Sequence, residues 1–402
     1  MHVRLVLALM GRLFMAGVAS LLLALGASLF GASGGAGSER LRWASTDLGV
    51  FRGDANSEAL ALNERGQIAG RSCCDNQNRA HAFLWQAGRM TDLGSLGGWD
   101  VRPLAINEHG QIVGEANTKK RGKYGPMLHA FLWQGGKMVD LGTLGGDDSR
   151  LTAFNNRGQI IGSSTAKSGR QHAFLWQNGS MTDLGSSTFE ALAISEEGEV
   201  VGYGTPAGSN ATQPFVRQKG KLTFLKLPGS TYGEATGIND RGQVVGSSLV
   251  GGVPTAFLWQ NGKVTDLGMG GGRGIAINNR GQVIGTFFPP GAAHRHAALW
   301  QNGRLTDLTP NALVSGPASS ACDICLPAHS INEQGRVIGW TKNSVYGDAR
   351  QHAFVWENGR TTYLSTGRQE SQANAINNRG QIVGWITTKT GQRHAVLWTL
   401  KP

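Results

Sequence analysis

Histidine recurs at a fixed place in a repeated phrase of this chain. Six of the ten histidines open the phrase His-Ala-x-x-Trp, and regularly spaced histidines raise the question of a metal site. An aspartate in a second phrase, Thr-Asp-Leu, follows most copies. Equivalent residues of separate structural units cannot converge on one ion, so we predict no metal site and no cofactor. We expect each histidine to form a hydrogen bond to the backbone or to a neighbouring unit, and each aspartate to accept one in a turn.

A third phrase, Asn-x-x-Gly, follows a position whose residue type varies from copy to copy. Five residues before the Asn stand Glu58, Arg102, Arg150, Glu190, Glu234, Arg273, Pro327 and Gln372. Charged residues in otherwise small and apolar stretches have two interpretations. One is a polar ligand site, completed by Trp99, Asp100 and Tyr232 from neighbouring segments. The other, which we favour, is a belt of ion pairs between adjacent units.

A basic run lies in a segment whose length varies between copies. Residues 115–128 contain Lys119, Lys120, Arg121 and Lys123, in a chain of net charge +11. Such a loop could attract an anionic polysaccharide, a nucleic acid or a lipid surface, or it could simply be solvated. Nucleic acid is the weakest of these partners, because Tyr124 alone offers an aromatic ring beside the run for stacking on bases.

The four cysteines form two close pairs, Cys73 with Cys74 and Cys322 with Cys325. In an oxidising compartment these residues are predicted to form disulfides. A bridge between adjacent residues would be strained, so a local Cys322–Cys325 bridge and cross-pairing between the two loops both stay open. A zinc site of four thiolates is disfavoured, because the two pairs belong to different units.

Together the three phrases define a repeating unit of about 45 residues. The Asn-x-x-Gly phrase recurs eight times, at Asn63, Asn107, Asn155, Ser195 (in place of Asn), Asn239, Asn278, Asn332 and Asn377. The residues before it predict a first strand, with Asn and Gly at the outer positions of a type I turn. A second strand follows the turn, and the histidine phrase predicts a third, whose tryptophan packs between units. Asn-Gly pairs such as Asn178-Gly179 predict a tight hairpin into a fourth strand.

Four strands in a unit of this length are typical of a β-propeller blade. The eighth unit ends after Trp398 without a fourth strand, whereas an orphan copy, Thr46-Asp47-Leu48-Gly49, precedes the first unit. Pairing the two would remove the exposed sheet edges. We therefore predict an all-β fold, an eight-bladed β-propeller over residues 41–400, with four strands per blade and closed by the N-terminal strand. The varying charged positions would ring one mouth of its central channel.

These phrases resemble the HAF repeats, an extracellular repeat family named after His-Ala-Phe. The resemblance covers nearly all of residues 41–400. It implies an exported bacterial repeat protein, and it brings no established catalytic residues. The fourth unit departs most from the pattern, with Ser195, Arg217 and Phe224 where other units have Asn, Trp and Asp.

The first 36 residues predict export. They contain Arg4 and Arg12, no acidic residue, an apolar stretch over 13–32 and small residues at 33–36, the composition of a secretory signal peptide. Cleavage after Ser33 and cleavage after Ala36 both stay open, and an uncleaved membrane anchor is the alternative. The expected location is extracellular or periplasmic, with the membrane touched only through an uncleaved N-terminal segment.

Composition and motifs leave three classes of function. Glycine supplies 60 of the 402 residues without a three-residue period, which excludes a collagen-like fibre. No P-loop, Gly-x-Ser-x-Gly or His-Glu-x-x-His motif is present. We favour an exported, non-enzymatic binding or scaffold module that recognises a glycan or protein partner on the face with the variable loops. The alternatives are an envelope enzyme acting on polysaccharide and a purely structural protein; the sequence does not predict the oligomeric state.

Overall fold

The computed structural model describes residues 43–51, 53–73, 79–122, 125–185, 189–292, 295–309, 324–326, 330–342, 350–365 and 369–401. The chain divides into two units, Met1–Arg40 and Leu41–Pro402, and all described residues belong to the second. In them the secondary structure is entirely β, arranged as eight four-stranded antiparallel sheets. Among these residues there is no helix long and apolar enough to cross a membrane.

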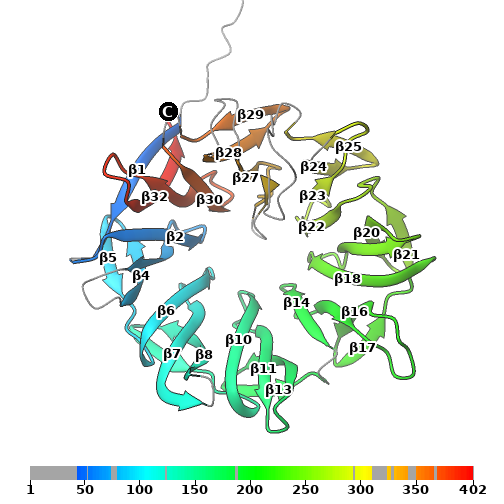
Figure 1. Ribbon diagram of the computed structural model, residues 1–402, viewed down its shortest axis with the longest axis horizontal. Helices are drawn as coiled ribbons and strands as arrows, with labels where there is room; N and C mark the ends of the chain where they lie inside the picture. The colour runs from blue at the N-terminus through cyan, green and yellow to red at the C-terminus, as the bar shows by residue number, and fades with distance from the viewer. Residues whose placement is uncertain are drawn as a thin grey trace, which may run out of the picture. The chain divides into compact units, whose positions relative to one another are not determined.

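The sheets are arranged radially as the blades of a propeller (Figure 1), which confirms the predicted fold. Blade 1 contains β2 (Asn56–Leu62), β3 (Ile68–Cys73), β4 (Ala80–Gln86) and β5 (Arg89–Asp92). Blade 2 contains β6 (Gly97–Ile106), β7 (Ile112–Gly122), β8 (Gly125–Gln134) and β9 (Lys137–Asp140). Blade 3 contains β10 (Gly145–Phe154), β11 (Ile160–Ala166), β12 (Gln171–Gln177) and β13 (Ser180–Asp183). Blade 4 contains β14 (Glu190–Ile194), β15 (Val200–Gly204), β16 (Gln213–Gln218) and β17 (Lys221–Phe224).

The second half of the ring repeats this order. Blade 5 contains β18 (Ser230–Ile238), β19 (Val244–Val250), β20 (Val253–Gln260) and β21 (Lys263–Asp266). Blade 6 contains β22 (Arg273–Ile277), β23 (Val283–Phe287), β24 (His296–Gln301) and β25 (Arg304–Asp307). Blade 7 contains β26 (Ile324–Cys325), β27 (Val337–Lys342), β28 (Gln351–Glu357) and β29 (Arg360–Tyr363). Blade 8 contains β30 (Ser371–Ile376), β31 (Ile382–Thr387), β32 (Arg393–Leu400) and β1 (Trp43–Gly49).

Local sequence explains the turns. After the first strand of blade 1, Gly66 N–H donates to Asn63 O at 3.1 Å, and Gly66 has a φ of 77°, which favours glycine. In the hairpin between the third and fourth strands of blade 3, Asn178 and Gly179 have φ values of 52° and 82°. Two successive positive φ values are those of the turn that Asn-Gly pairs favour. Both turn predictions are confirmed.

Apolar side chains fill the spaces between adjacent blades. The phenylalanine of the third strand is fully buried in blades 1, 2, 3 and 7. Trp133, Trp176 and Trp398 are buried, and the equivalent tryptophans of blades 1, 5, 6 and 7 pack, partly buried, against neighbouring core residues. The predicted packing role of the repeated tryptophan is confirmed.

The first and last strands of the propeller meet in blade 8. β1 pairs antiparallel with β32, with Trp43 opposite Leu400 and Asp47 opposite Val396. The N-terminal strand is therefore the fourth strand of the last blade, as predicted. β1 and β32 lie far apart in the sequence, and their pairing closes the ring within blade 8. Opening the ring there would break the hydrogen bonds between these two strands.

The two ends of the ring are defined by the direction of the first strands. We call the end that carries the Asn-x-x-Gly turns the turn end, and the opposite end, where the first strands begin, the variable end. At the turn end the residue after each repeat Asn or Ser195 donates its backbone N–H to the equivalent side chain of the next blade. These bonds form a closed ring through Glu64, Glu108, Asn156, Glu196, Asp240, Asn279, Glu333, Asn378 and back to Glu64.

Candidate functional site

The repeated histidine and aspartate form a pair within one blade. His129 Nδ1 lies 2.8 Å from Asp140 Oδ1, and His394 of β32 lies 2.8 Å from Asp47 of β1 across the closure. The same pair forms in blades 1, 3 and 6. Our expectation that the histidine bonds to the backbone or to another unit was therefore wrong about its main partner, because the third and fourth strands place the two side chains next to each other.

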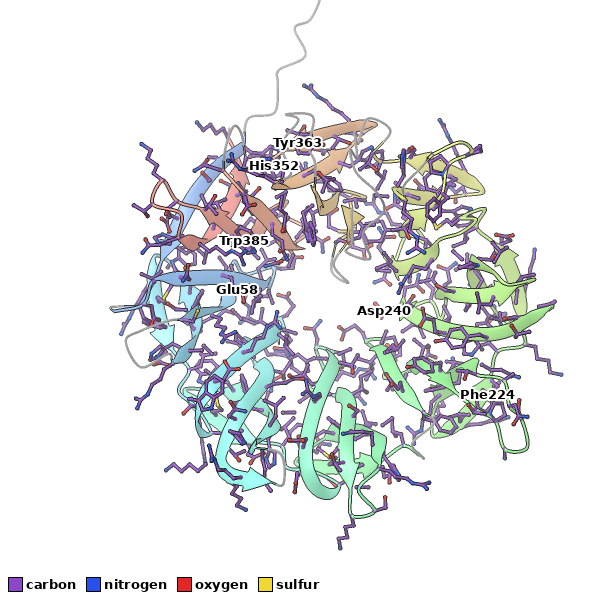
Figure 2. The ribbon with its side chains drawn as sticks, in the orientation of Figure 1. Glu58, Phe224, Asp240, His352, Tyr363 and Trp385 are labelled. Atoms are coloured by element: carbon purple, nitrogen blue, oxygen red, sulfur yellow. The ribbon has the colours of Figure 1, made fainter. Side chains whose placement is uncertain are left out.

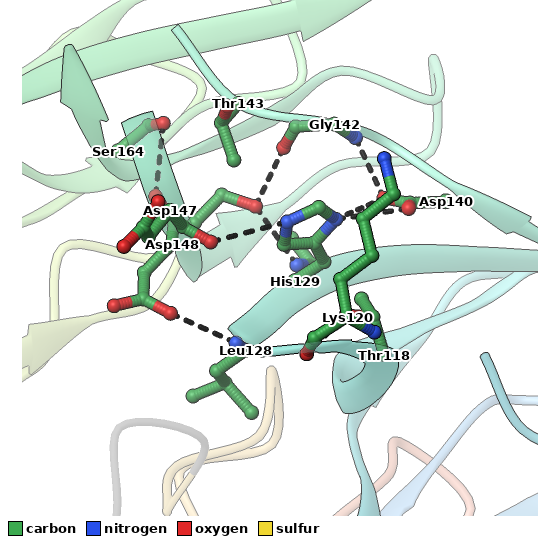
Figure 3. Close-up of polar contacts among 12 residues, drawn as sticks. Thr118, Lys120, Leu128, His129, Asp140, Gly142, Thr143, Asp147, Asp148 and Ser164 are labelled. Carbon is green, nitrogen blue, oxygen red and sulfur yellow. Dashed lines mark hydrogen bonds and ion pairs between the residues drawn. The ribbon is translucent and has the colours of Figure 1, made fainter. Parts of the chain in front are cut away.

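Figure 3 shows this pair where blade 2 meets blade 3. His129 Nε2 also lies 3.2 Å from Asp147 O of the next blade, and Gly142 N–H donates to Asp140 Oδ1, the turn contact predicted for the aspartate. The hydrogen bond with Asp140 raises the pKa of His129, against the effect of burial. Burial would raise the pKa of Asp140, but the hydrogen bonds from His129 and Gly142 outweigh it and the pKa is lowered.

Three blades depart from the pair. Blade 4 has Pro214 and Phe224 at the two positions, and blade 5 has Thr255 before Asp266. In blade 7 the aspartate is replaced by Tyr363, and His352 is fully buried with its ring edge-on to that tyrosine. Figure 2 labels Phe224 in blade 4 and His352 and Tyr363 in blade 7. Five blades share the pair and three lack it, so the ring does not need it in every blade.

Seven of the eight varying positions lie in the first strands of their blades, and Pro327 falls outside the described residues. The favoured belt of ion pairs is absent there: in the described part of the chain Glu58, Arg102 and Arg273 form no ion pair. Arg150 lies 4.0 Å from Glu115 of blade 2, and its side chain is 64% exposed. Asp100 pairs instead with Arg71 of blade 1 at 2.6 Å. The belt was wrong: Arg102, Arg150, Glu190 and Arg273 are exposed to solvent, and Glu58 and Glu234, which are half-buried, form no ion pair in the described part of the chain.

Two tyrosines and two glutamates gather where blade 4 meets blade 5. Tyr203 lies opposite Glu190 in the sheet register, and Tyr232 donates to Glu234 at 3.5 Å. The tyrosine rings are 6.4 Å apart. Burial raises the pKa of both tyrosines, and the neighbouring glutamates add to the effect. Both phenols therefore stay protonated near neutral pH and act as hydrogen-bond donors. Gln372, the remaining varying residue, accepts a hydrogen bond from Gln351.

A cavity of about 520 Å³ lies at the variable end between blades 1 and 2. It brings together Trp99, Lys119 and Arg121, which sequence reasoning had assigned to two separate features. Trp99 is 54% exposed, and both basic side chains are exposed. The stem of Lys119 lies against Gly97, where an added Cβ would be 2.5 Å from Lys119 Cγ. Arg79 and His81 of blade 1 complete the wall.

The basic segment is strand rather than loop. Lys119, Lys120 and Arg121 belong to β7, which pairs with β8 as far as Gly122 opposite Gly125; Lys123 lies outside the described residues. The paired strands extend blade 2 at the variable end. The pairing of Arg121 and Gly122 with β8 fixes the backbone at the end of this segment.

The remaining predicted residues add no site. Cys73 ends β3 and Cys325 ends β26, whereas Cys74 and Cys322 lie outside the described residues, so the disulfides stay a prediction. No group of three or more His, Cys, Asp or Glu in the described ranges could hold a metal ion. The three glutamates of blade 4 lie at the turn end: Glu196 belongs to its ring, Glu197 pairs with Arg157 and Glu199 accepts from Gln218.

Sequence reasoning missed the arginines that precede the third strand. Arg79 lines the cavity beside Trp99, and Arg295 lines another at the same end. The signal was present, because an arginine stands one or two residues before the histidine in five units, at Arg79, Arg170, Arg295, Arg350 and Arg393.

Comparisons with known proteins give one partial family match and distant structural likenesses. The family described as "Protein of unknown function (DUF3466)" matches residues 273–395, and no curated protein matches the chain significantly. The dipeptidyl peptidase 4 of Porphyromonas gingivalis has a TM-score of 0.50 at 8% identity, covering 81% of this chain and 57% of that one. The β-propeller domain of the Pyrococcus furiosus Trilobed protease has a TM-score of 0.49 at 10% identity, covering 74% and 95%.

The eight radial sheets define the class of protein, a β-propeller, and the comparisons add nothing finer. This chain spans 57% of the length of the Porphyromonas peptidase, and at such low identity a shared fold does not transfer an activity.

Proposed function

We propose that this chain is an exported binding module whose variable end recognises an anionic polysaccharide. The observation that carries the proposal is the cavity between blades 1 and 2, where an exposed Trp99 lies with Lys119 and Arg121. An exposed tryptophan offers a flat apolar surface for the face of a sugar ring, and the two cations attract its acidic groups. Export is supported by the pattern of the first 36 residues.

The charge pattern of this cavity favours an acidic ligand over a neutral one. Asp100, the acid next to Trp99 in the sequence, is paired with Arg71, and Asp92 is paired with His81. Lys119 and Arg121 form no ion pair within the described ranges. Asp100 is thus neutralised by Arg71 and Asp92 is bonded to His81, whereas the two cations are open to a polyanion.

Binding of the purified protein to polygalacturonate and to neutral dextran would test the proposal. We expect binding to polygalacturonate alone, with an affinity that falls steeply between about 50 and 500 mM NaCl because the attraction is electrostatic. Trp99→Ala should weaken binding about tenfold, by loss of stacking. It should leave the unfolding midpoint unchanged, since the side chain is exposed.

Equal binding of dextran, or no binding of polygalacturonate at low salt, would contradict the proposal. The second result would direct attention to a protein partner at the same end. Trp99→Phe is the matched control, because it keeps an aromatic face and should retain most of the affinity.

A further inference from the structure

A second cavity at the variable end lies where blade 5 meets blade 6, with a volume of about 300 Å³. Its polar wall comes from three strands: Tyr232 and Glu234 of β18, Ser247 of β19 and Arg273 of β22. Glu234 lies directly opposite Ser247 in the sheet register, so their side chains share one face of blade 5. Blades 5 and 6 are four places from blades 1 and 2 in a ring of eight, and the two cavities share no residue.

Ser247 is a buried hydroxyl without a partner. The residue is only 8% exposed, and in the described part of the chain its Oγ forms no hydrogen bond. A buried polar group left unsatisfied is unfavourable. Because Ser247 lines the cavity, a small rotation of its buried hydroxyl would let a ligand there supply the missing bond. The hydroxyl can donate or accept, which suits a ligand with hydroxyl groups of its own.

The charges of the wall favour a ligand that carries a carboxylate. Arg273 and Arg295 both line the cavity, and neither forms an ion pair within the described ranges. The guanidinium of Arg295 lies over the ring of Phe288, 5.4 Å from its centroid, a contact that holds the side chain without neutralising it. Two guanidinium groups face a single carboxylate, Glu234. The planar guanidinium matches a carboxylate by two parallel hydrogen bonds.

We propose that this cavity binds a single carboxylated sugar unit of the hexuronate class. Its carboxylate would pair with Arg273 and Arg295, and its ring hydroxyls would bond to Glu234 and Ser247. Leu249 and Pro254, which form the apolar part of the wall, would pack against its C–H face. The site goes beyond the proposed function because it recognises one sugar unit, whereas the cavity beside Trp99 is proposed to attract a polymer.

Calorimetric titration of the purified protein with sodium glucuronate tests this assignment, with glucose and glutamate as comparison ligands. We expect glucuronate to bind with a Kd on the order of 1 mM, and glucose and glutamate to bind at least tenfold more weakly. Arg273→Gln should reduce the affinity at least tenfold and Ser247→Ala about fivefold. Arg273→Gln should leave the unfolding midpoint unchanged, because the side chain has no ion-pair partner in the described part of the chain. Ser247→Ala should not lower the midpoint, because it removes a buried hydroxyl that has no hydrogen-bond partner there.

Arg241→Gln is the matched control, because it removes one exposed arginine at the turn end, and it should bind glucuronate like the wild type. The assignment is overturned if glucuronate does not bind at tens of millimolar concentration, if both Arg273→Gln and Ser247→Ala bind it unchanged, or if glutamate binds equally well. Failure of the polymer site would look different: polygalacturonate binding would be missing while glucuronate binding persisted.

Discussion

The turn end and the variable end of the ring are built from the same eight blades, yet they use different residues. At the turn end, repeated residues bond each blade to the next, and the eight backbone-to-side-chain bonds close on themselves. Asp240, labelled near the centre of Figure 2, is one member of that ring. At the variable end, residues that differ from blade to blade line cavities of about 520, 260 and 300 Å³.

The difference separates the residues that maintain the ring from those available for recognition. A residue repeated in every blade forms the same contact eight times, and that symmetry suits assembly. A ligand that is not eightfold symmetric needs unlike residues side by side, and at the variable end such residues line the cavities. Substitutions at the turn end should therefore alter stability, and substitutions at the variable end should alter binding.

The largest expected effect on stability is at a repeat asparagine. Asn278 is 5% exposed. It donates to Gln282 at 2.7 Å and to Asn332 O of blade 7 at 2.9 Å, and it accepts from the backbone of Arg280 and Gln282. Asn278→Ala should lower the free energy of unfolding by about 3 kcal/mol, because it leaves several buried groups unsatisfied. Urea denaturation measures this.

Asn278→Ser is the control for that prediction, because blade 4 forms its turn with Ser195. The loss in free energy of unfolding should be smaller for the serine variant than for the alanine variant. Equal and small losses for both substitutions would show that the asparagine bonds do not hold the blades together.

A smaller effect on stability is expected in blade 7, where an arginine and a glutamate replace the two hydrogen-bonded glutamines of other blades. In blades 1 and 5 a glutamine after the turn donates to a glutamine at the end of the third strand. Blade 7 has Arg336 and Glu357 there, 2.7 Å apart and about one-fifth exposed. Glu357→Gln should cost about 1.5 kcal/mol by leaving the arginine unpaired. The double variant Arg336→Gln, Glu357→Gln should recover most of it, since it restores the common pair.

Additive losses in that double-mutant cycle would contradict the interpretation that the two residues act as a pair. Thermal unfolding of the three variants provides the measurement.

The smallest expected effect is the pH dependence of the His129–Asp140 pair. Since the folded-state pKa of His129 is raised, its contribution is present below about pH 6.5, the unfolded value, and is lost as the pH rises through the folded pKa. Since the pKa of Asp140 is lowered, its contribution is present above about pH 3.9 and is lost as the pH falls through the folded pKa. The pair should thus stabilise most between about pH 4 and 6.5.

We expect that contribution to be under about 1 kcal/mol, because the Asp140 side chain is 42% exposed and solvent screens the pair. Asp140→Asn should flatten the stability difference between about pH 5.5 and 8.5. A pH profile identical to that of the wild type would show that the pair does not titrate with folding.

Sequence reasoning predicted the blades, the turns and the closure, because repeated residues report the same local geometry eight times. It also placed Trp99 and the basic run at the variable end. It did not foresee that Trp99, Lys119 and Arg121 line one cavity, because the pairing of β7 with β8 beyond Asn117 decides that. The His–Asp pair was missed although a signal existed: Pro214 and Phe224 replace both members in the same blade.

The belt of ion pairs was predicted wrongly for a related reason. Spacing places equivalent residues of adjacent blades at the same height, but it does not give the direction of long side chains. Arg71, which lies outside the repeated phrases, forms an ion pair with Asp100.

Matched charge reversals at the two ends test the central claim most directly. Lys119→Glu with Arg121→Glu acts at the variable end, and Arg241→Glu with Arg280→Glu makes the same change of net charge with two exposed arginines at the turn end. Binding to polygalacturonate at about 50 mM NaCl should fall at least 30-fold for the first variant and less than about threefold for the second. Equal losses would mean that a basic protein attracts a polyanion without a site, and would contradict the account.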